Sequence, residues 1–229
     1  MKQTWHDLLF AHWPAPPEKI RPLVPLELEL DLFDGSCWIG VVPFRMSGVR
    51  ARWLPTLPAL SRFPELNLRT YVNCGDKPGV YFFSLDAANR AAVWAARKFF
   101  HLPYFDAAMS SQDNDGTIHY SSRRSRAVAD LRASYRPTSP EQPFERWSLE
   151  RWLTERYCLY AVHDESVYRC EIHHQKWPLQ DAEAEFESNT VASAAGIELS
   201  GTASSLLFAR RLEVLIWPLR RAAETSPRV

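Results

Sequence analysis

Short stretches in which apolar and polar side chains alternate recur along this chain of 229 residues, and this period-two pattern constrains its fold more than any other feature. Residues 26–33 (LELELDLF) alternate leucine with acidic side chains, and residues 65–73 alternate in the same way. Successive side chains of a strand point to opposite faces, so each stretch predicts a half-buried strand. Many short strands with few helices predict an α+β fold, with a largely antiparallel sheet or barrel in a single domain over residues 1–229.

Turn and cap residues predict how some of these elements are connected. The Asp34-Gly35 turn predicts a hairpin between residues 26–33 and 37–48, and Pro17 opens a short helix. Asp86 is expected to cap the clearest helix, over residues 88–102. Residues 50–65 predict a proline-interrupted loop, and residues 5–13 show no clear pattern. Further strands are expected at 66–74, 80–87, 104–111, 116–125, 127–136, 158–164, 166–175, 184–188 and 212–219, and further helices at 144–157 and 190–196.

Charge and motif content exclude several functional classes. The 27 basic and 27 acidic side chains cancel, which disfavours nucleic acid as a partner. No run approaches the roughly 18 apolar residues of a membrane span, and the N-terminus lacks the apolar region of a secretion signal, so we expect a cytoplasmic protein with no membrane partner. The motifs GxGxxG, GxxxxGK[ST] and GxSxG are absent, so we expect no nucleotide cofactor and no hydrolase elbow.

Cysteine and histidine spacing predicts neither disulfides nor a metal site. The cysteines are scattered among strand-forming residues without a CxxC pair, which predicts reduced thiols. His173 and His174 are adjacent on an expected strand and would point to opposite faces, so they would not share an ion. The basic cluster of Arg123, Arg124, Arg126, Arg132 and Arg136 is expected at solvated strand edges.

The strand over residues 65–73 is the most informative for function. Its polar side chains share one face, and these are Glu65, Asn67, Arg69, Tyr71 and Asn73. This face is either solvated or lines a ligand cavity. In a cavity, the glutamate can transfer a proton, the arginine can hold a carboxylate or oxyanion, and the asparagine and tyrosine can orient the ligand.

Long segments of the chain resemble the YqjF-like family of uncharacterised bacterial proteins. The matching segments are residues 8–44, 63–72, 78–105 and 212–219, in order along nearly the whole chain. More weakly, IRPLVPLELELD and AARKFFHLPYF are similar to motifs of the acetoacetate decarboxylase superfamily. This resemblance implies a cone-like, mostly antiparallel β-barrel with a few helices packed outside and a pocket inside.

The same resemblance implies which residues occupy the pocket. Glu65 matches a pocket glutamate of the superfamily, and Arg97 matches the arginine of its Gly-Arg-Glu helix. The Schiff-base lysine follows a proline in the superfamily, and Tyr104 follows Pro103 here. The position of a pocket arginine falls near His6, and that of a second glutamate falls near Ile39. A phenol cannot form an imine, so the resemblance argues against decarboxylase chemistry.

Two functional hypotheses follow. The first is a lyase or isomerase that works on a small oxo or carboxylate compound without an imine. Arg69 would hold the substrate, Glu65 would move a proton and Tyr104 would donate to an oxyanion. The residues expected to contact the substrate are Asn67, Tyr71, Arg97 and His6. The alternative is a non-catalytic protein that binds or senses a small molecule, and a homo-oligomer is left open.

Overall fold

A computed structural model describes residues 1–50, 62–75 and 77–222, and in these ranges the chain is mostly β-strand. The strands are β1 (Lys2–Ala15), β2 (Glu29–Leu30), β3 (Cys37–Arg50), β4 (Phe63–Cys74), β5 (Lys77–Ala87), β6 (Tyr104–Asn114), β7 (Thr117–Arg124), β8 (Asp130–Pro137), β9 (Cys158–His163), β10 (Ser166–His174), β11 (Leu179–Asn189), β12 (Ser205–Ile216) and β13 (Arg220–Arg221). The helices are α1 (Pro17–Ile20), α2 (Arg90–Phe100) and α3 (Leu149–Thr154), with 3-10 turns η1 (Arg21–Leu23) and η3 (Ser193–Ala195).

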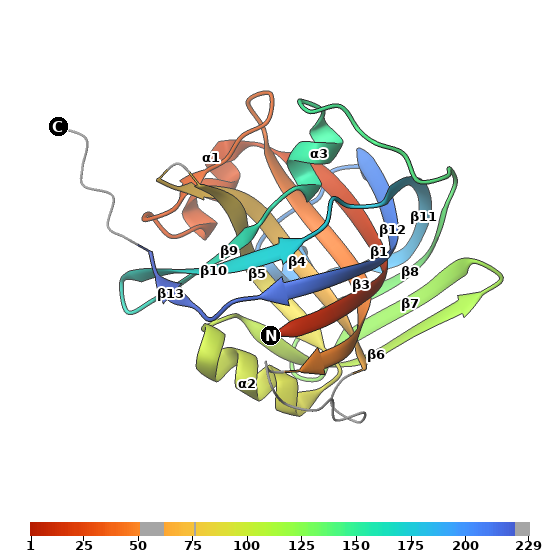
Figure 1. Cartoon of the computed structure of the whole chain (residues 1–229), viewed down its shortest axis with the longest axis horizontal. Helices are drawn as coiled ribbons and strands as arrows, with labels where there is room; N and C mark the ends of the chain where they lie inside the picture. The colour runs from red at the N-terminus through yellow and green to blue at the C-terminus, as the bar shows by residue number, and fades with distance from the viewer. Residues whose placement is uncertain (51–61, 76, 223–229) are drawn as a thin grey trace.

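The strands pair into one ring-like sheet (Figure 1). From β5 the pairings run through β6, β7, β8, β11, β12, β1, β3 and β4, and β4 pairs with β5 again. The strands β9 and β10 join β5 to β12 and so complete a second ring of paired strands, which we call the second closure. The expected antiparallel barrel is therefore met in part: the sheet is ring-like, but it is mixed, because β5 runs parallel to both β6 and β9.

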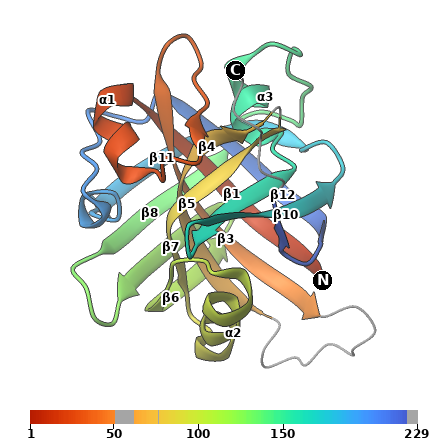
Figure 2. The ribbon, with the colours of Figure 1, turned by 90° about the vertical axis from the view of Figure 1, so that its left-hand side faces the viewer.

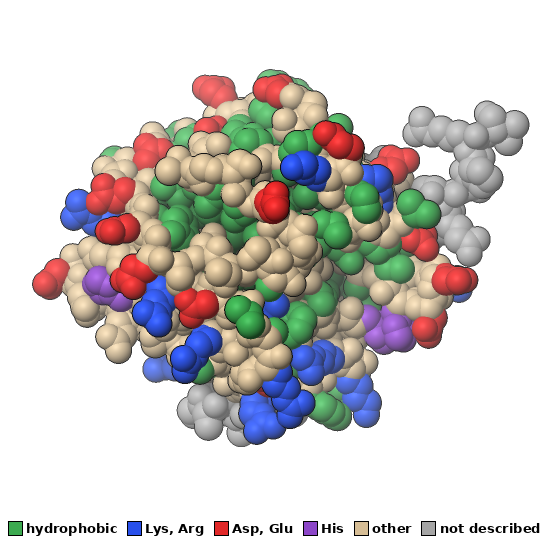
Figure 3. All heavy atoms as spheres, turned by 180° about the vertical axis from the view of Figure 1, so that it is seen from behind, with side chains coloured by type: hydrophobic (Ala, Val, Ile, Leu, Met, Phe, Trp, Pro, Cys, Tyr) green, Lys and Arg blue, Asp and Glu red, His purple; other side chains and the backbone are tan. Residues whose placement is uncertain are grey.

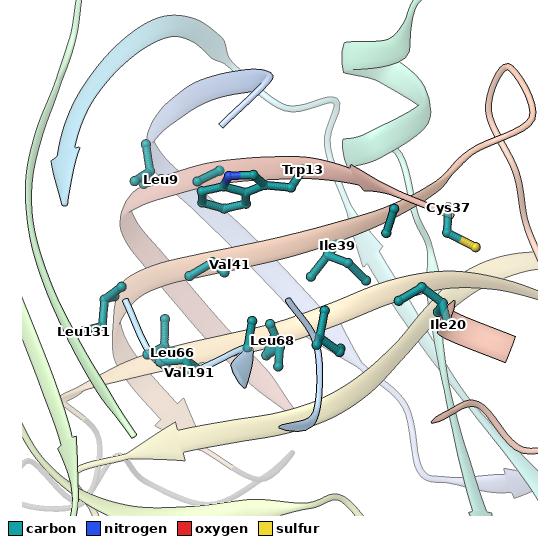
Figure 4. Close-up of a cluster of buried hydrophobic side chains, with 14 of the residues drawn as sticks. Leu9, Trp13, Ile20, Cys37, Ile39, Val41, Leu66, Leu68, Leu131 and Val191 are labelled. Atoms are coloured by element: carbon teal, nitrogen blue, oxygen red, sulfur yellow. The ribbon is translucent and has the colours of Figure 1, made fainter. Parts of the chain in front are cut away.

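Because β4 belongs to both closures, both of its faces are buried. Leu66 and Leu68 face an apolar core with side chains of β1 and β3, among them Trp13, Ile39 and Val41 (Figure 4). The opposite face of β4 carries the polar side chains and looks toward the second closure. Burial on both faces is typical of a strand in the interior of a fold. The polar face of β4 is therefore not a solvated face.

The helices lie at opposite ends of the ring. In both ribbon views α1 and α3 lie at one end, and α2 covers the other (Figures 1 and 2). The α2 helix begins after Asn89, whose side-chain oxygen accepts hydrogen bonds from the amides of Ala91 and Ala92, both at 3.1 Å. It ends at His101, which adopts a left-handed conformation with φ of 52°.

The expectation that Asp86 caps α2 is wrong. Asp86 lies inside β5, where its side chain is buried and paired with Arg124 at 2.7 Å. Asn89 takes the cap position because its side chain lies next to the free amides of the first turn. Arg124 also differs from its expected solvated position, since only 4% of its side chain is exposed.

The segment over residues 26–33 is the clearest error in the expected strands. Within it only β2 forms, and it pairs with β4, so the expected hairpin with residues 37–48 is absent. The turn itself is present, because Phe33 and Ser36 form a bridge around Asp34-Gly35. The first strand, β1, carries no clear alternation because Asp7, with φ of 53°, interrupts it. Of the expected loop over residues 50–65, residues 51–61 lie outside the described ranges, and residues 63–65 are not loop but the start of β4.

Further expectations concern the cysteines, the segment near the C-terminus and residues 190–196. The cysteines are free, and three of them are buried. The segment near the C-terminus is a core strand, β12, and the expected helix over residues 190–196 is the 3-10 turn η3, closed by Gly196. No helix of the described residues is long and apolar enough to cross a membrane.

Candidate functional site

A cavity of about 210 Å³ lies in the second closure of the sheet, between β4 and the β9–β10 pair. Its lining comes from β1, β3, β4, β5, β9 and β10, and the inner side of α2 contributes Ala92, Ala96 and Phe100. Most lining side chains are apolar, including Trp5, Phe10, Phe44, Phe82 and Trp177. An apolar cavity with a few polar groups is the usual form of a small-molecule site.

Bulges in the strands decide which side chains reach this cavity. On β1, Gln3 and Trp5 line it before Asp7, whereas Leu8 and Phe10 line it afterwards, so the alternation changes phase at the bulge. Asp7 is held there by ion pairs with Arg45 and Arg210, both at 2.9 Å. A simple alternation along β1 would therefore assign half of this strand to the wrong face.

Glu65 forms one polar end of the cavity, and only 4% of the residue is exposed. Its Oε2 accepts a hydrogen bond of 2.9 Å from the Tyr104 hydroxyl. Burial raises the pKa of Glu65 from 4.5 to about 8, although the Tyr104 bond opposes that rise and Asp86 adds to it. Burial also raises the pKa of Tyr104 well above its usual value. Glu65 is therefore a neutral acid at neutral pH, and the phenol remains protonated.

The raised pKa of Glu65 predicts a pH-dependent stability. Unfolded Glu65 loses its proton above about pH 4.5, whereas folded Glu65 keeps it up to about pH 8, so raising the pH between these values favours the unfolded state. We expect the free energy of unfolding of the wild type, relative to Glu65→Gln, to fall over that range in denaturant titrations. Tyr104→Phe should extend the fall to higher pH, because the hydrogen bond from Tyr104 lowers the pKa of folded Glu65 and leaves that of the unfolded state unchanged. A difference that does not vary with pH would contradict the assignment.

Two arginines form another polar part of the lining. The guanidinium of Arg156 donates to Asp31 Oδ2 at 2.5 Å and to the Trp152 carbonyl at 2.7 Å. Arg69 donates to the Leu153 carbonyl and the Tyr71 hydroxyl at long distances of 3.3 and 3.4 Å. Burial lowers the pKa of Arg156, and the charge of Arg69 adds to this effect while Asp31 opposes it. The two cations thus influence each other electrostatically, with one carboxylate to balance them.

This pair of arginines has unused hydrogen-bonding capacity. Arg69 Nε and Arg156 Nη2 are buried and have no partner among the described residues. No carboxylate of the described residues forms an ion pair with Arg69. A buried cation without a counter-charge is unfavourable, so this end of the cavity is suited to an anion.

A buried network of hydrogen bonds that includes Tyr71 and His12 positions Arg69. The Tyr71 hydroxyl donates to the Leu153 carbonyl at 2.8 Å, so the 2.7 Å contact with His12 Nε2 places the histidine proton on Nε2. Burial, and after it the charge of Arg69, lowers the pKa of His12 well below its usual value, so the ring is neutral. The guanidinium of Arg69 lies 5.4 Å from the ring of Phe10. These contacts hold Arg69 without neutralising it.

The structure brings together four of the residues that the sequence singled out. Glu65, Asn67, Arg69 and Tyr104 line the cavity. Tyr71 lies behind Arg69 and is fully buried.

Two other candidates from the more distant resemblance, Arg97 and His6, lie elsewhere. Arg97 donates to the Tyr104 carbonyl at 2.7 Å on the outer side of α2, and it is not part of the lining. His6 contacts Ser47 at 2.7 Å, and Ile39 is in the apolar core.

Sequence reasoning missed Arg156 and His174. Arg156 follows α3, far from β4 in sequence, and no local pattern marks it as a cavity residue. His174 was considered only as a metal ligand. Its ring lies 5.0 Å from that of Trp177 in the cavity wall, and burial lowers its pKa. Among the described residues no lysine lines the cavity, and no group of three or more His, Cys, Asp or Glu could hold a metal ion.

Comparison with known structures shows the fold. The chain is similar to an acetoacetate decarboxylase-like enzyme from Sphingomonas wittichii RW1, with a TM-score of 0.67 and 13% identity over 96% of this chain and 92% of that one. It is also similar to the enduracididine biosynthesis enzyme MppR complexed with pyruvate, with a TM-score of 0.70 and 12% identity over 98% and 91%. Acetoacetate decarboxylase from Legionella pneumophila subsp. pneumophila str. Philadelphia 1 matches with a TM-score of 0.65 and 12% identity over 97% and 87%.

Sequence comparison shows the family. The chain is 51% identical over 222 residues to the uncharacterized protein YqjF of Bacillus subtilis (strain 168), covering 96% of this chain and 92% of that protein. The model of DUF2071, an uncharacterized conserved protein family, matches residues 2–213. The resemblance to YqjF-like proteins is thus confirmed, and the chain belongs to the DUF2071 family, with an acetoacetate decarboxylase-like fold.

Proposed function

We propose that this protein is an enzyme that acts on a small oxo or carboxylate compound by acid–base chemistry, as a lyase or isomerase that forms no imine. The two buried arginines carry the proposal, because they leave donor atoms unused and one positive charge unbalanced in a largely apolar cavity. A carboxylate bound there would accept these donors and supply the missing negative charge. Arg69 and Arg156 therefore hold the substrate.

Glu65 provides the proton transfer. Residues 65 and 69 are four positions apart on one strand, roughly 13 Å along the backbone, so the carboxylate of a bound molecule would lie away from Glu65. Glu65 would face a different part of the substrate. Below about pH 8 it is neutral and can donate a proton to a carbonyl oxygen, and its ionised form can accept a proton from the adjacent carbon. Isomerisation, dehydration and aldol-type reactions all use such a transfer.

Tyr104 supports Glu65 and cannot replace a lysine nucleophile. Its hydroxyl proton is donated to Glu65 Oε2, so in this geometry it positions the carboxyl group and does not point to an oxyanion. A phenol forms no imine with a ketone, and none of the described cavity residues is a lysine. Asn67 is another polar residue of the lining, and its Oδ1 has no partner among the described residues. It would orient the substrate.

A non-catalytic binding protein is the second candidate. One observation favours it: Glu65 is the only carboxyl group of the described residues that lines the cavity, so there is no second carboxyl group to share acid and base roles. Such a protein would use the same arginines to hold its ligand.

A panel of small oxo acids tests the proposal. Pyruvate is present in the complex of MppR, so it heads the panel, followed by 2-oxo acids with longer or aromatic ends and by the amide of each as a neutral control. A ligand that binds only the folded state raises the melting temperature, so we expect the acids, and not the amides, to raise it. Turnover of the best acid is then followed by NMR. If none of the acids raises the melting temperature, the proposal is wrong.

Glu65→Gln separates the two candidates. An enzyme of the proposed kind should keep its affinity for the acid and lose turnover by about 100-fold or more, the scale of general acid–base catalysis. Binding without turnover in the wild type would favour the binding protein. Turnover that survives Glu65→Gln would contradict the role given to Glu65.

A further inference from the structure

A second hollow, distinct from the cavity, lies on the outside of the molecule between α2 and the adjoining parts of β6 and β7. It has a volume of about 790 Å³. The groove is lined by Arg90, Arg97, Phe105, Arg124, Ser125 and Arg126, together with small alanine side chains and Asp106. We call this hollow the arginine groove.

Charge in the arginine groove is strongly unbalanced. Arg124 is neutralised by Asp86. The other three arginines are exposed, and none forms an ion pair with a carboxylate in the described part of the chain. Asp106 is the one carboxylate among the residues that line the groove, so two positive charges remain in a chain whose total charge is zero. Figure 3 shows Lys and Arg side chains gathered in the lower part of the rear face.

Two arginines of the groove, Arg97 and Arg124, lie against Phe105. The guanidinium of Arg124 lies 4.1 Å from the centre of the Phe105 ring, and that of Arg97 lies 5.9 Å from it. Arg97 is fixed further by its Nε, which donates to the Tyr104 carbonyl at 2.7 Å. A guanidinium held in this way loses less conformational entropy when it binds an anion. Its terminal nitrogens are left for a ligand.

We propose that the arginine groove binds the phosphoryl group of a small phosphate ester. Arginine pairs with phosphate through two parallel hydrogen bonds, and a phosphoryl dianion matches the two unbalanced charges better than a single carboxylate does. Ser125 adds a hydroxyl group at the rim. The volume of the groove exceeds that of phosphate itself, which leaves room for the organic part of the ester.

The groove would then act beside the cavity and not within it. Tyr104 lies between them: its carbonyl accepts from Arg97 on the groove side, and its hydroxyl donates to Glu65 on the cavity side. The proposal does not depend on what the cavity binds. The melting temperature of each variant of the groove therefore serves as the check that it is folded, whatever the cavity binds.

Calorimetric titration at low salt tests the proposal with inorganic phosphate, pyrophosphate and glycerol 3-phosphate as probes and with sodium chloride as the control for ionic strength. We expect the ester to bind. The double variant Arg90→Gln/Arg126→Gln should weaken its binding by at least tenfold. Arg123→Gln is the matched control, because Arg123 precedes Arg124 on β7 and points to the other face, where it does not line the groove.

The outcomes divide clearly. The proposal is supported if the ester binds the wild type and Arg123→Gln equally well. The double variant should then bind the ester at least tenfold more weakly and keep the melting temperature of the wild type. No heat with any probe at millimolar concentration would overturn it, as would equal binding by the double variant. Binding to vesicles of phosphatidic acid, or to single-stranded DNA, without binding of the soluble ester would also overturn it and assign the groove to a lipid surface or a nucleic acid.

Discussion

Asp86→Ala is expected to lower the free energy of unfolding by about 3–5 kcal/mol, because it leaves the charge of Arg124 buried without its partner. Only 1% of the Asp86 side chain is exposed. Its carboxylate accepts from Arg124 Nε at 2.7 Å and from the Ser122 hydroxyl at 3.2 Å. For a chain of this length the loss corresponds to a melting temperature lower by roughly 6–20 °C, measured by calorimetry.

Two further variants make this prediction specific. Replacing both partners, as Asp86→Leu with Arg124→Met, removes the unpaired charge and should recover part of the lost stability. The Arg136–Glu183 pair serves as the exposed control, with 58% and 55% of the side chains exposed, and Glu183→Gln should cost less than about 1 kcal/mol. An Asp86→Ala protein as stable as the Glu183→Gln protein would show that Arg124 escapes to solvent through the adjoining groove.

Arg69→Met is expected to weaken the binding of the best oxo acid by about 10- to 100-fold, since a hydrogen bond to a charged group contributes about 1.5–3 kcal/mol and 1.4 kcal/mol is a factor of ten. The unliganded protein should keep or raise its melting temperature. The reason is that Arg69 is buried with no carboxylate partner in the described residues, and its hydrogen bonds to the Leu153 carbonyl and the Tyr71 hydroxyl are long. Isothermal titration and thermal unfolding measure the two effects.

Without a ligand, Asp86→Ala should lower the melting temperature, whereas Arg69→Met should keep or raise it. This difference distinguishes a charge that stabilises the fold from one that binds a ligand. Arg211→Met is the control for Arg69, because 59% of the Arg211 side chain is exposed and it lies outside the cavity. It should leave affinity unchanged. A large loss of stability in Arg69→Met, with affinity preserved, would mean that Arg69 serves the fold and not a ligand.

The period-two patterns located most strands, and the exceptions have physical causes. Alternation found β4, since its polar and apolar side chains alternate strictly over residues 65–69. It missed β1, where the bulge at Asp7 reverses the phase. It overestimated residues 26–33, where only Glu29 and Leu30 pair with a neighbour. An alternating segment is a strand only if a partner strand has free backbone groups beside it.

From the sequence, only those residues of the candidate site that share one strand could be predicted. Glu65, Asn67 and Arg69 could be grouped because β4 alone places them on one face. Arg156 could not be added, because it is brought to Arg69 by the connection after α3. The distant resemblance correctly pointed to the fold and to the Tyr104 position as a cavity residue. His6, which it suggested as a pocket residue, lies outside the cavity, since it alternates with Gln3 and Trp5, which line it.

By itself, the sequence determined which side chains of β4 lie together, that the chain belongs with YqjF-like proteins, and that only five of its 27 basic side chains are lysines. Only the tertiary structure decided that the polar face of β4 is buried in a cavity and not solvated. It also decided that Arg69 shares its charge environment with Arg156, and that Asp86 pairs with Arg124. Local periodicity records which side chains share a face, whereas the environment of that face is set by strands distant in sequence.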